Sequence, residues 1–301
     1  MPSLQSYLFR WIVQFYIAPQ YRRAGNSISE LRKLTDLTAR FQRVPAGTQV
    51  RTVLVRDTAA EWVCTPSVTD KRAGLYLHGG AFVMGSPATH RELAARLSAT
   101  IGARMLVLDY RLAPEHPFPA AMNDAISAYC WLLDEGYEPE RLVIGGDSAG
   151  GGLVLQSLIG LRDIGAPLPA AGFFMSPVTD WVRFDGESFA TRMGVDPWIT
   201  KEMCRVTAAA YVGENNPETR LLYPAGMELT GLPPVCIHVG DHEVLLSDSE
   251  RLAEAARSAV VEVEFKVWEG MVHVFQSGAS FVPEARRSLA EIGQFIQARM
   301  R

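Results

Sequence analysis

The sequence lacks the features that mark membrane-spanning, disulfide-stapled and nucleic-acid-binding proteins. It has no unbroken run of about 18 apolar residues, which a membrane-spanning helix requires. Its cysteines, Cys64, Cys130, Cys204 and Cys236, are far apart and form no C-x-x-C pair, so they predict buried thiols rather than a disulfide framework or a metal site. A formal charge of -4 argues against a nucleic-acid partner. We therefore expect a protein of the reducing cytoplasm that does not insert stably into membranes.

The N-terminal segment also lacks the signature of a secretory signal, because no basic leader precedes its apolar part and no small-residue cleavage site follows. Leu8, Trp11, Ile12 and Phe15 recur at the spacing of an amphipathic helix. We expect this apolar face to pack on the body of the protein. Covering a substrate site and touching a membrane are the alternatives.

Short apolar runs, most of them bounded by Gly, Pro or Asp, predict buried strands. They cover residues 50–55, 61–64, 75–77, 105–108, 142–144, 172–175, 235–239 and 261–267. Helical patterns lie between them, at residues 88–101, 119–135, 149–163, 247–259 and 284–299. The first two strands look like an antiparallel start. The alternation then predicts an α/β protein with a mostly parallel, doubly wound sheet of eight strands and helices on both faces.

Two regions depart from the alternation and divide the chain. Residues 1–45 read as helices, and residues 180–225 form an insertion rich in large apolar side chains. We expect both to form a cap over a core made of residues 46–179 and 226–301, although the insertion is also compatible with a larger core. The side chains expected to bind substrate are Phe82, Trp181, Met193, Trp198 and Tyr211.

The motif G-D-S-A-G at residues 146–150 directly follows a predicted strand and precedes a predicted helix. This context is typical of a nucleophile elbow, in which glycines on both sides let a sharp turn present the serine. Ser148 is the predicted nucleophile. A serine hydroxyl needs a base to take its proton, so the chain must also supply a histidine, an acid and an oxyanion hole.

Chain order selects the base, because in this arrangement the histidine follows both the serine and the acid. That order leaves His238, His242 and His273. His238 lies within a predicted strand, and His242 lies in the loop where the acid belongs. His273 lies just after the last strand, so it is the predicted base. In the acid loop, residues 240–248, three carboxylates remain open: Asp241, Glu243 and Asp248.

The oxyanion hole needs backbone N–H groups that point at the developing negative charge. We expect one from Ala149, directly after the nucleophile, and the others from Gly79, Gly80 and Ala81, in a turn after the third strand. His78 precedes the serine in the chain, so we expect it to brace this turn by hydrogen bonding instead of acting as the base.

Three motifs, H-G-G-A-F at 78–82, D-Y-R-L-A-P-E-H-P-F-P-A-A at 109–121 and G-D-S-A-G-G at 146–151, together resemble those of the hormone-sensitive-lipase-like esterases. This is the bacterial type IV family of the α/β-hydrolase fold, and the resemblance runs from about residue 73 to the C-terminus. It implies a serine–acid–histidine triad, a helical cap partly made by the N-terminus, no cofactor and a small-molecule ester as substrate. Arg111 and Glu115, in the second motif, are expected to be structural.

The chain departs from the family pattern at two sites. Ala81 stands where the family usually has a third glycine; its N–H can still serve if the backbone needs no positive φ there. The family's acid usually lies in a D-P-L-R-D stretch, and aligning that stretch puts Glu243 at the acid position, 30 residues before His273, with Asp241 as the alternative.

The predicted function is that of a serine carboxylesterase for short- to medium-chain acyl esters, acting through an acyl-enzyme. A lactone or amide hydrolase with the same triad is an alternative. A binding module like the plant gibberellin receptors, which have lost the histidine, is another. A homodimer is left open.

Overall fold

The computed structural model describes residues 1–25, 27–40, 42–66, 68 and 71–301. Its centre is one eight-stranded sheet with the order β1-β2-β4-β3-β5-β6-β7-β8. The strands are β1 (Gln49–Val55), β2 (Thr58–Cys64), β3 (Ala73–Leu77), β4 (Arg104–Leu108), β5 (Leu142–Asp147), β6 (Ala171–Met175), β7 (Val235–Gly240) and β8 (Val263–Trp268). The predicted number of strands is confirmed.

Strand direction also agrees with the prediction. β2 pairs antiparallel with β1 and with β4, whereas every pair from β4 to β8 is parallel. The central strands β3, β5, β6 and β7 are buried along their whole length, which explains their continuous apolar runs. β1 and β8 are the edges of the sheet and are largely exposed or half-buried.

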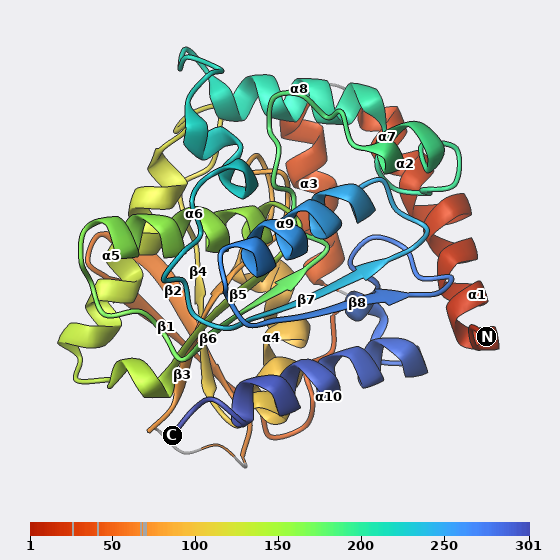
Figure 1. Ribbon diagram of the computed structural model, residues 1–301. Helices are drawn as coiled ribbons and strands as arrows, with labels where there is room; N and C mark the ends of the chain where they lie inside the picture. Colours follow the sequence, from red (N-terminus) through yellow and green to blue (C-terminus); the bar gives the residue numbers. More distant parts are fainter. Residues whose placement is uncertain (26, 41, 67, 69–70) are drawn as a thin grey trace.

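Helices cover both faces of the sheet and form two apolar cores (Figure 1). One face carries α5 (Ala120–Asp134), α6 (Ala149–Asp163) and α9 (Leu246–Ser258). The other carries α4 (Pro87–Ile101) and α10 (Pro283–Gln297). Short 3-10 turns, η2 (Pro139–Arg141) and η5 (Phe275–Gly278), precede β5 and follow β8. The predicted doubly wound architecture is therefore confirmed.

Two further groups of helices lie outside this alternation. The N-terminal group is α1 (Leu4–Ile12), the π-helical turn η1 (Val13–Ile17), α2 (Ala18–Ala24) and α3 (Ile28–Ala39). The insertion contains α7 (Glu187–Thr191), α8 (Lys201–Val212), η3 (Arg220–Leu222) and η4 (Pro224–Gly226). In Figure 1 α8 crosses the top of the molecule beside the N-terminal helices. The two groups touch through the rings of Tyr21 and Trp198, whose centroids are 4.9 Å apart.

Side chains of the second family motif tie the N-terminal helices to the core. Arg32 of α3 donates to the carbonyl oxygens of Val83 and Ala113 at 2.7 and 2.8 Å, and to both carboxylate oxygens of Glu115. Arg111, in contrast, binds Asp124 of α5. Arg111 and Glu115 thus have structural partners, but each pairs elsewhere in the chain and not with the other.

The orientation expected for α1 is wrong. The side that packs carries Ser6, Phe9 and, in η1, Val13, whereas Leu8, Trp11 and Phe15 are 51%, 47% and 56% exposed. The rotation is set at the start of the helix, where the N–H and hydroxyl of Ser3 both donate to the Glu284 carboxylate at 2.7 Å. Apolar spacing alone carries no information about such an anchor from α10.

Among the described residues, no helix has the length and apolar character that crossing a bilayer requires.

Candidate active site

Ser148 occupies a sharp turn between β5 and α6, with φ 53° and ψ -122°. A positive φ is strained for any residue with a side chain and clusters at functional sites. The neighbouring glycines are required by close approach: a Cβ at Gly146 or Gly150 would lie 2.4 or 2.0 Å from the carbonyl oxygen of Leu77 in β3. The turn can therefore form only with glycine at both positions 146 and 150.

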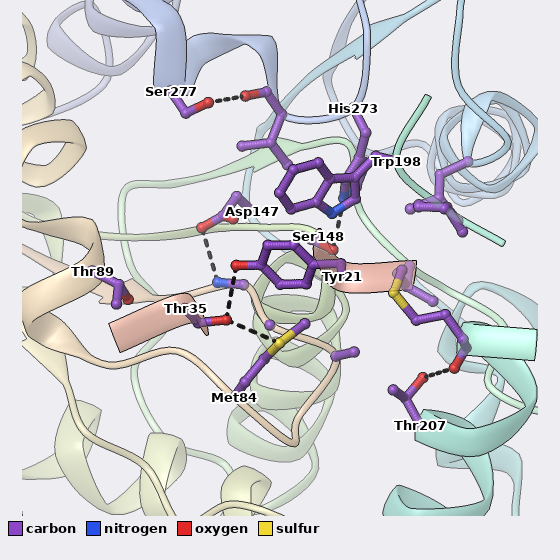
Figure 2. Close-up of a pocket in the computed structure, with 18 of the residues that line it drawn as sticks. Tyr21, Thr35, Met84, Thr89, Asp147, Ser148, Trp198, Thr207, His273 and Ser277 are labelled. Carbon is purple, nitrogen blue, oxygen red and sulfur yellow. Dashed lines mark hydrogen bonds between the residues drawn. The ribbon is translucent and has the colours of Figure 1, made fainter. Parts of the chain in front are cut away.

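His273 lies in the loop that follows β8, and its ring reaches the serine. Its Nε2 is 2.9 Å from the Ser148 Oγ (Figure 2). Its Nδ1 is 2.9 Å from the Glu243 Oε2. The chain carries these three side chains in three separate loops, after β5, β7 and β8. Parallel strands end at one edge of the sheet, which is why residues so distant in sequence meet there.

Glu243 is fully buried and fixed by three hydrogen bonds. Besides its contact with His273, its Oε1 accepts from the backbone N–H of Gly240 at 2.7 Å and from the Ser176 hydroxyl at 2.8 Å. A buried carboxylate is stable in its charged form only with such partners. The side chain therefore presents one oxygen to the histidine in a single orientation.

The other two candidate acids point elsewhere. Asp241 lies 2.6 Å from Nδ1 of its neighbour His242 and accepts from the Gly270 N–H at 2.6 Å. Asp248, at the start of α9, accepts from the backbone N–H of Thr179, and burial raises its pKa to about 7. Neither carboxylate is hydrogen-bonded to His273.

Two opposing effects act on the pKa of His273. Burial lowers it, whereas the hydrogen bond that Nδ1 donates to Glu243 and the negative charge of that carboxylate raise it, with smaller contributions from Asp196 and Asp147. The raising effects win, so the pKa of His273 lies above its ordinary value of 6.5. The imidazolium form is thus stabilised where a proton taken from Ser148 would arrive.

The glycine turn after β3 lies against the elbow. Asp147 fixes it by accepting from the backbone N–H of Gly79 at 3.0 Å and from the Tyr76 hydroxyl. Because the Gly79 N–H is used in this way, it does not face the space in front of Ser148. Among the described residues, the N–H groups of Gly80, Ala81 and Ala149 have no protein acceptor.

Ala81 differs from expectation, since its φ is 54°, in the region that favours glycine. Phe82 follows at φ 61° and is fully buried, with its ring stacked on Tyr211 at a centroid distance of 3.7 Å. This stacking and the surrounding core hold the strained turn. His78 braces it as expected: its Nδ1 is 2.8 Å from the Gly79 carbonyl oxygen, and burial lowers its pKa to about 3.

A cavity of about 380 Å³ opens in front of Ser148 and His273. Of the side chains expected to bind substrate, Trp181 and Trp198 line it. Phe82, Met193 and Tyr211 lie outside it, against our expectation; the stacked Phe82–Tyr211 pair belongs to the core beneath. Composition identifies an apolar insertion, but not which of its side chains face inward.

The N-terminal helices supply one wall of the cavity through Phe9, Val13, Ile17 and Tyr21. None of these four was among the side chains expected to bind substrate. Phe9, Val13 and Ile17 are spaced four residues apart, so a second apolar stripe was visible in the sequence next to the one we selected. The neighbouring stripe of Leu8, Trp11, Ile12 and Phe15 contains more aromatic residues, and it was the one expected to pack.

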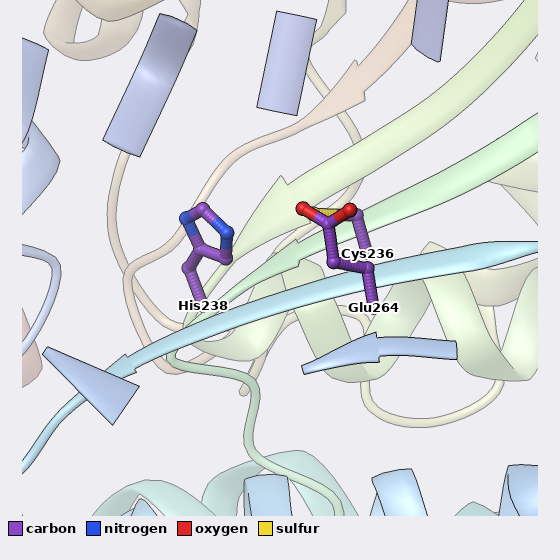
Figure 3. A group of neighbouring side chains, drawn as sticks. All are labelled: Cys236, His238 and Glu264. Carbon is purple, nitrogen blue, oxygen red and sulfur yellow. The ribbon is translucent and has the colours of Figure 1, made fainter. Parts of the chain in front are cut away.

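Away from the triad, the described part of the chain contains a group of potential metal ligands. Cys236 and His238 of β7 and Glu264 of β8 bring one donor atom each to within 4.8 Å of one another (Figure 3). His238 was expected to pack within its strand, and it is fully buried there.

Comparisons with known proteins agree with this fold. A family model described as the alpha/beta hydrolase fold matches residues 74–277. An acetyl-hydrolase of Streptomyces hygroscopicus is 42% identical over 245 residues, 81% of each chain, and esterase LipU of Mycobacterium tuberculosis is 37% identical over 84% of this chain and 89% of its own. The crystal structure of an esterase from the bacterial hormone-sensitive lipase family superposes with a TM-score of 0.93 at 39% identity, covering 100% of both chains.

The chain belongs to the hormone-sensitive-lipase-like esterases of the α/β-hydrolase fold. The predicted fold class is thereby confirmed, and the protein is a carboxylic ester hydrolase.

In this esterase, we expect Glu243→Gln to lower the pKa of His273, because the amide removes the negative charge that opposes the effect of burial. Asp241→Asn is the matched control and should leave that pKa unchanged. Titration of the His273 ring protons by NMR, with the signals assigned from a His273→Asn variant, measures both. A larger shift in Asp241→Asn than in Glu243→Gln would contradict the assignment of the histidine's partner.

Proposed function

We propose that this esterase is a serine carboxylesterase that hydrolyses short- to medium-chain acyl esters through an acyl-enzyme intermediate. One observation carries the proposal: the continuous path Ser148 Oγ–His273 Nε2 and His273 Nδ1–Glu243 Oε2, with 2.9 Å at each step. This is the geometry that general-base activation of a serine requires.

In the first half of the reaction, Ser148 attacks the ester carbonyl while His273 accepts its proton. Glu243 holds the ring in the tautomer that leaves Nε2 free to act, and stabilises the imidazolium that forms. His273 then donates that proton to the leaving alcohol. In the second half, water is the nucleophile that attacks the acyl-enzyme, and His273 accepts its proton. His273 then returns that proton to the Ser148 oxygen as the acid leaves.

We assign the oxyanion hole to the backbone N–H groups of Gly80, Ala81 and Ala149, and exclude Gly79 from it. Supporting this, the first three donors have no protein acceptor, whereas the Gly79 N–H is bound to Asp147. Donors fixed before the reaction stabilise the developing charge without having to reorganise. The role of Asp147 is then to position the turn that carries two of them.

The cavity supports the proposed substrate class. Its walls are mostly apolar, and its volume of about 380 Å³ lies near the small end of the range for ligand sites. The acetyl-hydrolase of Streptomyces hygroscopicus is named for a short acyl group. We propose that the N-terminal helices and the insertion together form the cap that closes this space, with Tyr21 and Trp198 at their contact.

Ser148→Ala should reduce kcat for p-nitrophenyl butyrate by about 10⁴-fold or more, since the nucleophile is lost and the triad acts as a unit. Ser157→Ala is the matched control: this buried serine of α6 only donates to the Leu153 carbonyl oxygen. It should retain wild-type kcat. Steady-state rates measure both, and a burst of p-nitrophenol in rapid mixing detects the acyl-enzyme. Substantial turnover by Ser148→Ala would refute the mechanism.

Trp198→Ala should shift the preference toward longer acyl chains, because this side chain lines the cavity and its loss lengthens the available space. Met193→Ala, in the same insertion but outside the cavity, should leave the preference unchanged. The ratio of kcat/KM for p-nitrophenyl octanoate to that for the acetate measures the shift. Equal profiles for the two variants would show that the wall at Trp198 does not limit chain length.

A further inference from the structure

Three donor side chains meet on the face of the sheet that α10 covers, on strands β7 and β8. Cys236 and Glu264 are direct partners in the parallel register, and His238 lies two residues along β7, on the same face as Cys236. Their donor atoms lie within 4.8 Å of one another (Figure 3). Because paired strands fix the spacing, the group is rigid and needs little rearrangement to surround an ion.

The ring of His238 is held in the orientation that a metal ligand needs. Its Nδ1 lies 2.8 Å from the Ser288 Oγ of α10, and that oxygen accepts from the Gln276 Nε2 at 3.0 Å. The other ring nitrogen, Nε2, is buried without a partner and faces Cys236 and Glu264 (Figure 3). A buried polar atom without a partner is costly, and a fixed second nitrogen is the usual companion of a metal-bound imidazole.

Neighbouring cations are already neutralised by other carboxylates. Lys266 Nζ binds Glu291 at 2.6 and 2.8 Å, and Arg299 pairs with Glu262. No lysine or arginine of the described chain forms a salt bridge with Glu264, which is exposed and has only the Cys236 thiol as a hydrogen-bond partner. The Glu264 carboxylate is thus not paired with a lysine or arginine, and its exposure lets an ion reach it from solvent.

We propose that Cys236, His238 and Glu264 form a Zn²⁺ site, with water as the fourth ligand. Sulfur, imidazole nitrogen and carboxylate oxygen are the three ligand types that Zn²⁺ takes in tetrahedral sites. On binding, the Cys236 thiol releases its proton to solvent and coordinates as thiolate. The ion ties β7 to the edge strand β8, the two strands whose following loops carry Glu243 and His273.

The test starts from chelator-treated protein titrated with Zn²⁺ by calorimetry, and with Co²⁺ as a spectroscopic substitute. We expect one ion per chain, a thiolate-to-Co²⁺ charge-transfer band, and a Tm that rises with Zn²⁺ concentration. Cys236→Ser should abolish the charge-transfer band, and Glu264→Gln should weaken Zn²⁺ binding at least tenfold. Because Glu264 is exposed, its variant keeps the test informative even if a buried variant fails to fold.

Cys130→Ser and Glu254→Gln, the latter at an exposed glutamate of α9, are the matched controls and should bind Zn²⁺ as the wild type does. Ester hydrolysis by every variant verifies that it is folded, independently of metal binding. The proposal is overturned if the wild type binds no ion, or if Cys236→Ser and Glu264→Gln bind Zn²⁺ as tightly as the controls.

A second inference comes from the outer side of α1 and η1. Leu8, Trp11, Phe15 and Tyr16 are 51%, 47%, 56% and 59% exposed, so large apolar side chains gather on one short segment. Contiguous exposed apolar patches mark interaction sites. The opposite side of the same segment lines the active-site cavity through Phe9, Val13 and Ile17.

The charge of this segment indicates the kind of partner. Arg10 lies in this segment and Arg22 and Arg23 follow in α2, whereas the first 29 residues contain no Asp or Glu, although the whole chain carries a net charge of -4. Aromatic and aliphatic side chains next to arginines are typical of helices that lie in the headgroup region of a membrane. We infer that this face docks on an anionic phospholipid surface, without crossing it.

Sedimentation with vesicles tests the docking. The protein should bind vesicles that contain phosphatidylglycerol and bind pure phosphatidylcholine weakly, and added salt should weaken the binding. The double variant Trp11→Gln/Phe15→Gln should lose at least tenfold in vesicle affinity. Ile164→Gln, 64% exposed after α6, is the control and should bind as the wild type does. Equal binding by both variants, or self-association that only the double variant abolishes, would overturn the inference.

Discussion

The strained turn at Ser148 is the constraint on which the rest of the site depends. Its positive φ raises the serine hydroxyl above the end of β5, and the turn closes only because Gly146 and Gly150 approach the Leu77 carbonyl oxygen in β3. The same approach brings the glycine turn after β3 beside the serine. The proposed nucleophile and the proposed oxyanion donors are thus positioned by one backbone contact between two central strands, and the buried sheet keeps that contact rigid.

Two buried carboxylates maintain this arrangement from either side. Asp147 accepts from the Gly79 N–H and the Tyr76 hydroxyl and so holds the glycine turn after β3. Glu243 accepts from the Gly240 N–H and the Ser176 hydroxyl and so holds its contact with His273. Both are nearly or fully inaccessible to water. A buried charge is tolerated only when its oxygens are hydrogen-bonded, and that requirement leaves each side chain a single orientation. The precision of the site follows from the cost of leaving these charges unpaired.

The parts of the site that depend on chain order could be predicted, and those that depend on side-chain orientation could not. The strand–turn–helix context identified Ser148, and the order of the loops selected His273. Alignment alone favoured Glu243 over Asp241, two residues apart in one loop, but their different hydrogen bonds exist only in the folded chain. The left-handed backbone of Ala81 and the use of the Gly79 N–H by Asp147 have no local sequence signal.

By itself, the sequence determined the number and direction of the strands and the turn at which Ser148 lies, because buried strands and tight turns impose composition on neighbouring residues. Only the tertiary structure decided which face of α1 packs, that Phe82 and Tyr211 stack in the core, and that Phe9, Val13 and Ile17 line the cavity. These features rest on contacts such as Ser3 with Glu284, 281 residues apart. Such partners are selected by packing in three dimensions. The N-terminal helices carry two apolar stripes, and periodicity alone does not say which of them packs.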